Sequence, residues 1–358
     1  MQQDFYAVGL MSGSSLDGLD LCYVHFIRQD NSSFSYKIIH SDYVAYDDIF
    51  REQLKQAPEL SAFAFAKLHA DLGRFFGMHT LSFFQKYAID KIDFICSHGQ
   101  TVFHQPTLNF SSQIGCGATI AQITKVKTIS DLRMSDAAAG GQGAPIVPIA
   151  EKYLFPDFNI FLNIGGICNI AFHNNNQILA YDVCAGNTLL NYLAKEKKKN
   201  YDEGGILARK GNICNELLET LNAIDFCKTN PPKSLGTEHI YKDWIHITNQ
   251  NNSSTEDKLA TCVEHIAMQI GKQTALQSIK DNQQILVTGG GAFNQFLMER
   301  IQYHTKAKVI IPDKETIENK EALAIAFFGL LRFLKIPNCL SSVTGAKKDV
   351  TGGAIYLP

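Results

Sequence analysis

Four short apolar stretches of this chain each run into a glycine-rich turn, and this recurrence limits the fold more than any other feature. The runs are GLMSGSSLDGLD (9–20), NIGGICNI (163–170), YDVCAGN (181–187) and VTGGGAFN (287–294). Glycine tolerates positive φ and lets backbone N–H groups approach an anion closely. One such turn is usually an ordinary hairpin, whereas four in one chain indicate a protein that holds phosphate groups with its backbone.

Neither common nucleotide-binding motif fits these turns. None reads G-x-x-x-x-G-K-[ST], and none reads G-x-G-x-x-G between a strand and a helix, so a different nucleotide-binding fold is needed. Apolar strands are predicted at 93–97, 159–164, 178–183 and 284–289, and a helical stripe of apolar residues runs through 63–84. This alternation of strands and helices predicts an α/β fold.

Length and composition narrow the class of protein. A chain of 358 residues exceeds what one hydrophobic core usually serves, so two domains are expected, with 131–148 as a candidate connection. With 45% apolar residues, 19% charged residues and a net charge of −2, we expect a globular protein without a nucleic-acid or membrane-surface partner. The nine cysteines form no C-x-x-C pair, and no signal peptide or membrane-spanning run is present, so the cytoplasm is expected.

Further runs turn this pattern into a specific resemblance. In chain order they include SHGQTVFHQP (97–106), QIGCGATIAQ (113–122), DLRMSDAAAGGQGAPIVP (131–148), YDEGG (201–205), PPKSLGTE (231–238), KEALAIAF (320–327) and TGA (344–346). Together with the glycine turns, they resemble the anhydro-N-acetylmuramic acid kinase family of the sugar kinase, actin and Hsp70 superfamily. The resemblance extends from about residue 8 to residue 356.

The resemblance implies a two-lobed sugar kinase/Hsp70/actin-like fold, in which each lobe has an RNase H-like mixed sheet flanked by helices. Lobe I is expected to comprise residues 1–127 and 344–358, with the first phosphate hairpin and a wall of the sugar pocket. Lobe II is expected at 128–343, with the second phosphate hairpin, a catalytic aspartate and an adenosine loop. A homodimer is also expected from the resemblance.

The function that the resemblance implies is unusual for a kinase. In the family's substrate, O6 is tied to C1 in an anhydro bridge, so water must open the bridge as O6 takes the γ-phosphate of ATP. The products are N-acetylmuramic acid 6-phosphate and ADP, formed in the recycling of cell-wall peptidoglycan. Two alternatives stay open: a phosphotransferase or phosphatase of the same fold with another small substrate, or a sugar-binding protein that has lost catalysis. Retention of Asp182 and Glu321 argues against the second alternative.

The ATP phosphates are expected at the opening glycine turn. Backbone N–H groups and hydroxyls of Gly13, Ser14 and Ser15 can hold the β- and γ-phosphates, and Asp17 or Asp20 can hold Mg²⁺ directly or through water. The alternative for Asp17 is a turn in which its carboxylate caps its own backbone. The full set of expected ATP-binding residues is Gly13, Ser14, Ser15, Leu16, Asp17, Gly18, Leu19, Asp20, Gly165, Gly166, Gly289, Gly290 and Gly291.

Two carboxylates are the expected catalytic residues. Asp182 matches the family's catalytic acidic residue, so the resemblance implies that it takes a proton from the attacking water. Its alternative role is to cap the helix that begins near Asn187. Glu321 lies in a strong helical pattern and, by the resemblance, faces the substrate cleft; its alternative is a surface glutamate that suits the helix dipole.

The sugar is expected to meet a cation and several polar side chains. Arg133 suits the lactyl carboxylate because a guanidinium group binds carboxylates with two parallel hydrogen bonds, the alternative being an ion pair between the lobes with Asp131 or Asp136. The other expected sugar-binding residues are His98, Gln100 and Gln142, the alternative for His98 and Gln100 being that they stabilise the walls of the pocket. A zinc site is not expected, because His98 and His104 lack a third ligand at suitable spacing.

The chain departs from the family pattern near its expected site. DVCAGN (182–187) stands where most members read D-T-G-P-G-N, so a threonine hydroxyl and a Gly-Pro pair are lost while the aspartate is kept. Leu235 and Thr237 stand where threonine and arginine are usual, and Ser14 replaces a threonine. These differences are expected to affect the shape of the loops and the range of substrates.

Overall fold

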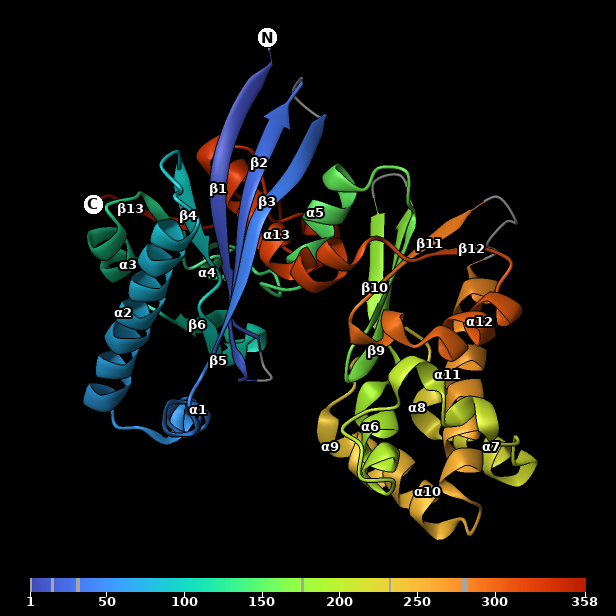
Figure 1. Ribbon diagram of the computed structural model, residues 1–358. Coiled ribbons are helices and arrows are strands. Elements are labelled where there is room, and N and C mark those ends of the chain that lie inside the picture. The colour runs from blue at the N-terminus through green and yellow to red at the C-terminus, as the bar shows by residue number, and fades with distance from the viewer. Residues whose placement is uncertain (1, 14–15, 30–32, 175–176, 232, 278–282) are drawn as a thin grey trace. The chain divides into compact units, whose positions relative to one another are not determined.

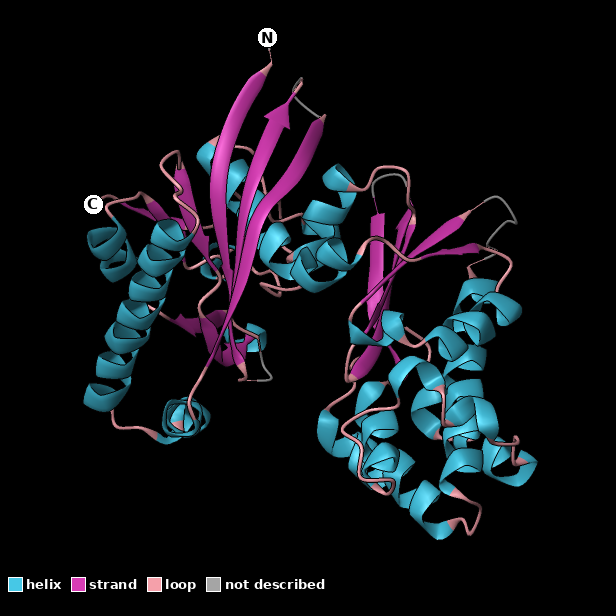
Figure 2. Ribbon diagram, viewed as in Figure 1, coloured by secondary structure: helices cyan, strands magenta, loops and turns pink. Residues whose placement is uncertain are grey.

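The computed structural model describes residues 2–13, 16–29, 33–174, 177–231, 233–277 and 283–358 (Figure 1). The chain forms two compact units: unit 1 comprises Met1–Pro156 and Asn319–Pro358, and unit 2 comprises Asp157–Glu318. Each unit combines a sheet with helices, as Figure 2 shows. The prediction of an α/β fold with a mixed sheet in each of two parts is therefore confirmed.

Unit 1 contains a six-stranded sheet in the order β13-β7-β4-β1-β2-β3. Its strands are β1 (Gln3–Met11), β2 (Gly18–Arg28), β3 (Phe34–Ala45), β4 (Phe94–Ser97), β7 (Thr128–Ser130) and β13 (Ala354–Tyr356). The first three strands form an antiparallel meander, β4 and β7 run parallel to β1, and β13 is antiparallel to β7. A separate pair is formed by β5 (Gln100–Gln105) and β6 (Phe110–Ile114).

Helices cover both faces of this sheet (Figure 1). They are α1 (Asp48–Lys55), α2 (Ala62–Lys86), α3 (Gly117–Thr124), α4 (Met134–Ala138), α5 (Val147–Leu154), α13 (Lys314–Phe333) and α14 (Ser341–Thr344), with short 3₁₀ turns at Ala57–Glu59 and Pro106–Leu108. Val8 and Leu10 of β1 pack in one core with Leu72 of α2, whereas Phe5 meets Phe333 of α13 with ring centroids 6.1 Å apart. The central strand is therefore buried on both faces, as its apolar sequence requires.

Helix α13 lies very close to the sheet because two glycines allow it. A Cβ atom at Gly9 would overlap the carbonyl oxygen of Ala322, and a Cβ atom at Gly329 would come within 2.5 Å of the Cβ atom of Cys96. No larger residue could occupy either position without moving the helix away from the sheet. This close approach places Glu321 beside the end of β1.

Unit 2 repeats the topology of the unit 1 sheet. Its order is β10-β9-β8-β11-β12, with β8 (Ile160–Ile164), β9 (Ile167–Asn174), β10 (Gln177–Ala185), β11 (Gln284–Thr288) and β12 (Lys308–Ile310). Again the first three strands form an antiparallel meander, and the later two run parallel to the first. The glycine turns at 9–20 and 163–170 therefore occupy the same topological position, after the first strand of each sheet.

The helices of unit 2 pack around α11 (Thr255–Leu276). The others are α6 (Asn187–Lys195), α7 (Asn215–Asn222), α8 (Asp225–Lys228), α9 (Thr237–His239), α10 (His246–Gln250) and α12 (Gln295–His304), with short turns at Glu203–Gly205, Ala208–Lys210 and Gly290–Phe293 and a π-helical stretch at Ile240–Ile245. Trp244 is fully buried in this core and donates its indole N–H to His265. Among the described residues, no helix is both long and apolar enough to cross a membrane.

The boundaries of the units differ from the expected ones. Residues 128–156 and 319–343 were expected in lobe II, but they belong to unit 1. The reason is tertiary: β7 pairs with β4, Tyr153 at the end of α5 packs on Phe34 of β3 with ring centroids 5.7 Å apart, and most of α13 packs on β1 and β4. The division therefore lies at Pro156 and at Glu318, within α13, rather than at 127 and 343.

Candidate active site

The turn between β1 and β2 is held by hydrogen bonds from neighbouring loops. Leu16, with φ of 54°, donates its N–H to Gly13 O at 3.3 Å, and Tyr46 donates its N–H to Asp17 O at 2.9 Å. Ser14 and Ser15, two of the expected phosphate-binding residues, lie outside the described residues. Of the expected residues that the structure describes in this turn, Gly13 and Leu16 are half-buried and Asp17 is exposed.

The remaining expected residues of this run belong to strand β2. Gly18 and Leu19 pair with Ala45 and Val44 of β3, and the Leu19 side chain is fully buried in the core. A Cβ atom at Gly18 would overlap Val44 O. Only the backbone of these two residues is therefore available near the turn.

Three carboxylates of unit 1 influence one another near this turn. Burial, together with the negative charges of Glu321 and Asp17, raises the pKa of Asp20 to about 6. Glu321 is exposed to solvent, yet desolvation by the surrounding protein atoms raises the pKa of its carboxyl as well. The positive charges of Lys320 and Arg133 oppose this increase. Such mutual repulsion is relieved when a cation binds, and oxygen donors suit Mg²⁺.

Arg133 is held by His98, also in unit 1. The Nε and Nη2 atoms of Arg133 lie 3.1 and 2.9 Å from His98 Nε2, while His98 Nδ1 lies 2.9 Å from Gly99 O. Because a guanidinium can only donate, Nε2 is the acceptor and the proton of the ring is on Nδ1. Burial, aided by the charge of Arg133, lowers the pKa of His98 to about 3, so the imidazole is neutral and holds the guanidinium by its lone pair.

The alternative ion pairs of Arg133 are not seen in the described part of the chain. Asp136 is fully buried and accepts hydrogen bonds from Gly143 N at 2.7 Å and Thr344 Oγ1 at 2.8 Å, and no ion pair joins Arg133 with Asp131 or Asp136 among the described residues. The Nη1 atom of Arg133 has no partner among those residues. It is the part of the guanidinium left for a ligand.

The other expected sugar-binding residues of unit 1 have different surroundings. Gln100 is buried, and its Oε1 accepts a hydrogen bond from Ser12 Oγ at 2.6 Å, directly before the β1–β2 turn. Gln142 is exposed and is tied through its backbone N–H to Thr344 O at 2.8 Å. Gln100 therefore supports the turn, whereas the Gln142 side chain is free to meet a ligand. A small hollow of about 210 Å³ beside His98 is also lined by Asp131.

The glycine turn of unit 2 is tied to the start of helix α6. Gly186 N donates to Gly166 O at 2.9 Å, and Asn187 N donates to Gly165 O at 2.8 Å. A Cβ atom at Gly186 would lie 2.6 Å from Gly165 O, so only glycine allows this contact. Gly166 is exposed beside the start of α6, where the helix dipole favours an anion, although the first N–H groups of the helix already donate to Gly165 O, Gly166 O and Gly186 O.

Asp182 lies on β10 immediately before a bulge. Its Oδ2 accepts hydrogen bonds from Leu235 N at 2.8 Å and Ser234 Oγ at 3.2 Å, whereas Oδ1 accepts none from the residues that the structure describes. Burial raises the pKa of this carboxyl, and the two hydrogen bonds oppose the increase. Helix α6 is capped by Gly186 without a side-chain hydrogen bond, so Asp182 does not act as its cap.

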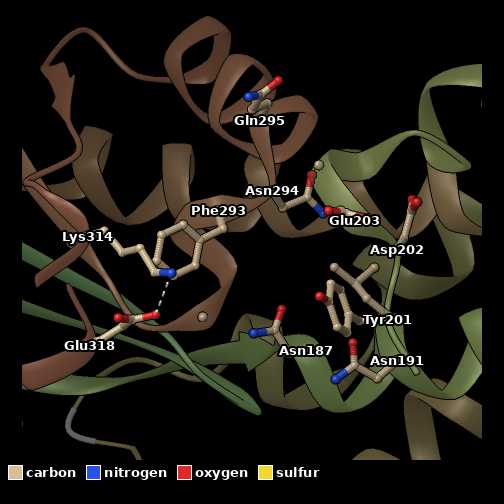
Figure 3. A pocket seen from close by; sticks show the side chains of 13 residues that line it. Asn187, Asn191, Tyr201, Asp202, Glu203, Phe293, Asn294, Gln295, Lys314 and Glu318 are labelled. Carbon is tan, nitrogen blue, oxygen red and sulfur yellow. Dashed lines mark ion pairs between the residues drawn. The ribbon is translucent and has the colours of Figure 1, made fainter. Parts of the chain in front are cut away.

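Unit 2 also holds a cavity of about 650 Å³ (Figure 3). Its lining residues come from α6, the 201–204 loop, the turn after β11 and the start of α13: Asn187, Leu190, Asn191, Tyr201, Asp202, Glu203, Gly204, Gly290, Phe293, Asn294, Gln295, Lys314 and Glu318. Figure 3 shows Phe293 beside the Lys314–Glu318 ion pair and Tyr201 across from it. Two partly exposed aromatic rings therefore face a space large enough for a nucleoside.

Several polar groups of this cavity have structural roles. Asp202 accepts hydrogen bonds from Leu207 N at 2.8 Å and Ala208 N at 2.9 Å, and Asn294 caps α12 through Leu297 N at 3.0 Å. Gly289 has a φ of +80°, and a Cβ atom at this position would lie only 2.6 Å from Asn163 Oδ1. The loops around the cavity are thus fixed by hydrogen bonds within the protein.

Of the expected residues, the structure places Gly290 in this cavity and Gly289 and Gly291 beside it. The other lining residues, including Tyr201, Phe293 and Lys314, were not among the expected site residues. Tyr201 and Phe293 could have been found, since they belong to the runs YDEGG and TGGGAFN. Lys314 belongs to none of the runs that carry the resemblance.

Comparisons with known proteins give similar structures and relatives of the whole chain. One solved structure, component A of (R)-2-hydroxyglutaryl-CoA dehydratase from Acidaminococcus fermentans, has 13% identity and a TM-score of 0.48, covering 90% of this chain and 97% of that one. Much closer in sequence is the anhydro-N-acetylmuramic acid kinase of Aliivibrio fischeri, with 34% identity over 364 residues and 98% of each chain covered. The enzyme of that name from Pseudomonas syringae pv. tomato has 34% identity over 381 residues, covering 99% of each chain.

The family model described as anhydro-N-acetylmuramic acid kinase matches residues 5–358. The match includes both glycine turns, Asp182 and Glu321, and it spans both compact units. With relatives that are about one-third identical over nearly their whole length, this match shows that the chain belongs to the anhydro-N-acetylmuramic acid kinase family.

Proposed function

We propose that this chain uses ATP and water to convert 1,6-anhydro-N-acetylmuramic acid into N-acetylmuramic acid 6-phosphate, with release of ADP, in the recycling of peptidoglycan. The observation that carries the proposal is the Asp182 carboxylate, which is held through Oδ2 and leaves Oδ1 open, in a chain of this family. A base that is partly buried and has one free lone pair suits the removal of a proton from water.

The nucleotide is proposed to bind in unit 2. The 650 Å³ cavity accommodates adenosine, with its base against Phe293 or Tyr201, and the exposed Gly166 of the nearby turn can offer its backbone N–H to phosphate at the positive end of the α6 dipole. Gly290 supports the proposal because it lines the cavity without a side chain, whereas at Gly289 and Gly291 a Cβ atom would overlap Asn163 or Ile164 and glycine is required by packing.

Unit 1 is proposed to contribute the metal ligands and the sugar contacts. Asp17 and Asp20 fit Mg²⁺, because they are oxygen donors whose mutual repulsion a cation relieves. When bound, Mg²⁺ neutralises charge on the phosphates of ATP. Arg133, held by His98 with Nη1 free, is proposed to bind the lactyl carboxylate, and Gln142 is proposed to meet the sugar oxygens.

In the proposed reaction, Asp182 removes a proton from the water that attacks C1, the C1–O6 bond breaks, and O6 attacks the γ-phosphorus of ATP. Glu321, whose pKa is raised by burial, is proposed as the second catalytic carboxyl. The reaction adds both phosphate and the elements of water to the sugar. We further propose, from the resemblance alone, that the protein acts in the cytoplasm and as a homodimer.

The test is Asp182→Asn, with Asp225→Asn as the matched control, because Asp225 is an exposed aspartate of the same unit. The Asp182 variant keeps the size of the side chain but loses the basic lone pair, so turnover should fall by about a hundredfold or more while calorimetry still detects ATP and the sugar. In H₂¹⁸O, wild-type product should carry the label at C1. Near-normal turnover of the Asp182 variant would refute the proposed mechanism.

The alternatives are separated by the product formed from a panel of anhydro and free sugars with ATP and Mg²⁺. Mass spectrometry should show the anhydro sugar heavier by phosphate plus water. A product heavier by phosphate alone, formed only from a free sugar, would indicate another phosphotransferase of this fold. Binding of the sugar without any product would indicate a protein that has lost catalysis.

A further inference from the structure

A short segment of unit 2, residues 233–235, runs alongside the edge strand β10 and meets Asp182 three times. Asp182 N donates to Lys233 O at 3.2 Å, and in return Leu235 N donates to Asp182 Oδ2 at 2.8 Å. Ser234 Oγ donates to the same Oδ2 atom at 3.2 Å. The two carboxylate oxygens therefore differ: Oδ2 has two donors, and Oδ1 has none among the described residues.

The two hydrogen bonds on Oδ2 fix the orientation of the Asp182 carboxylate. A carboxylate on a free side chain turns about its last bond, because that rotation has only a broad preference. Two donors on one oxygen restrict the rotation and leave the lone pairs of the other oxygen directed away from the segment. Leu235 anchors this arrangement because its side chain is buried in the core of unit 2, only 5% exposed.

We propose that Ser234 is a positioning residue for the general base: its hydroxyl, together with the Leu235 N–H, fixes the Asp182 carboxylate so that Oδ1 faces the reacting water. The inference rests on the proposed function and deepens it. Ser234 acts through Asp182 and is not itself proposed to touch substrate. Ser234 is exposed, so it contributes through this single hydrogen bond to Asp182 rather than through packing.

The charges around Asp182 come from the same segment. Lys233 is the charged neighbour that opposes the effect of burial on the Asp182 pKa, and its Nζ is held by Phe226 O at 2.9 Å. The other titratable groups near Lys233 are Lys272 and the thiols of Cys184 and Cys227. A hydrogen bond with Cys168, followed by burial, raises the pKa of the Cys184 thiol, and burial raises that of Cys227 to about 11, so neither thiol carries charge at neutral pH.

The test is the pH profile of Ser234→Ala. Loss of a hydrogen bond to the charged form of a carboxylate raises its pKa, by about half a unit to one unit for a long, exposed bond. The acid limb of kcat/KM should therefore move upward by that amount. Below the limb, the rate should fall about three- to tenfold, and above it the loss should be small because Asp182 is ionised there in both proteins.

Two variants control for the hydroxyl. Ser234→Thr retains the donor and should restore the acid limb to the wild-type position. Thr237→Ala removes another exposed hydroxyl of the same stretch, which forms no bond with Asp182 among the described residues, and it should leave the limb in place. Fluorescence of Trp244, the single tryptophan, reports that the core of unit 2 is folded in every variant.

The outcomes distinguish this inference from the proposed function. An upward shift of the acid limb in Ser234→Ala, restored in Ser234→Thr, supports the inference. A loss of rate in Ser234→Ala that is equal at all pH values, or no loss of rate, overturns the inference. A shift of the acid limb that occurs equally in Ser234→Ala and Ser234→Thr also overturns it. If Asp182→Asn is inactive while Ser234→Ala keeps the wild-type profile, the base assignment stands and only the positioning role fails.

Discussion

Replacement of Asp20 by asparagine should stabilise the protein, and it should do so only at the higher pH values. Asp20 lies on β2 near Asp17 and Glu321, and burial followed by these two charges raises its pKa from 3.8 to about 6. When folding raises the pKa of a carboxyl, the folded state favours the protonated form over the ionised form. Its ionisation therefore costs stability, and this cost appears as pH rises from about 4 to about 6.

The magnitude follows from the size of the shift. An increase of about 2 pH units corresponds to about 3 kcal/mol, since one unit corresponds to about 1.4 kcal/mol. Asp20 is only partly buried, so solvent screens the interaction, and we expect about half of that value, ~1.5 kcal/mol. Asp20→Asn removes the charge at nearly constant size. The variant should match the wild type near pH 4 and exceed its free energy of unfolding by ~1.5 kcal/mol near pH 8.

Urea unfolding followed by far-UV circular dichroism, without Mg²⁺, provides the measurement. Trp244 lies in unit 2, so its fluorescence follows that unit separately from the unit that contains Asp20. Asp90→Asn, at an exposed aspartate of unit 1, is the matched control and should show no gain with pH. A constant difference between Asp20→Asn and wild type over the whole range, or a loss of stability at pH 8, would refute the reasoning.

Two further substitutions test the packing of unit 1 and the cavity of unit 2. Lys320 and Glu151 form a buried ion pair at 2.6 Å. Lys320→Met should lower the free energy of unfolding by about 3–5 kcal/mol, because it leaves the Glu151 charge buried without its partner. The double variant Lys320→Met with Glu151→Met should recover most of that loss, as measured by urea unfolding. If the double variant is no more stable than the single one, the ion pair is not the cause. Phe293→Ala should weaken ADP binding about tenfold by calorimetry with no change in melting temperature, whereas Tyr303→Ala, at an exposed ring elsewhere on unit 2, should bind normally. Equal binding by both variants would show that the adenine base does not lie against Phe293.

The positions of the glycine turns in the candidate site were predictable, because a run of glycines after an apolar strand marks a tight turn of the backbone. The turns at Gly165–Gly166 and Gly289–Gly291 lie at strand ends, as the sequence predicts, and the strands and the long helix α2 lie within a few residues of their expected positions. Each of these features depends on local patterns of apolar and small residues. The boundaries of the units depend instead on pairing over long separations, such as β7 with β13, and no local pattern indicates those partners.

The roles of the polar residues were harder to predict, and SHGQTVFHQP shows why. From the sequence, His98 and Gln100 can either line a sugar pocket or stabilise its walls, and the run does not distinguish the two roles. In the structure, His98 holds Arg133 from 35 residues away, and Gln100 holds Ser12 from 88 residues away. Whether a polar side chain meets a ligand or another side chain depends on partners that are distant in the chain. Asp182 shows the converse: its segment partners lie about 52 residues further on, and only their positions reveal that one of its oxygens is held while the other stays open. The identity of a catalytic residue can therefore be predicted from a family pattern, but its orientation, on which its chemistry depends, follows from the tertiary structure.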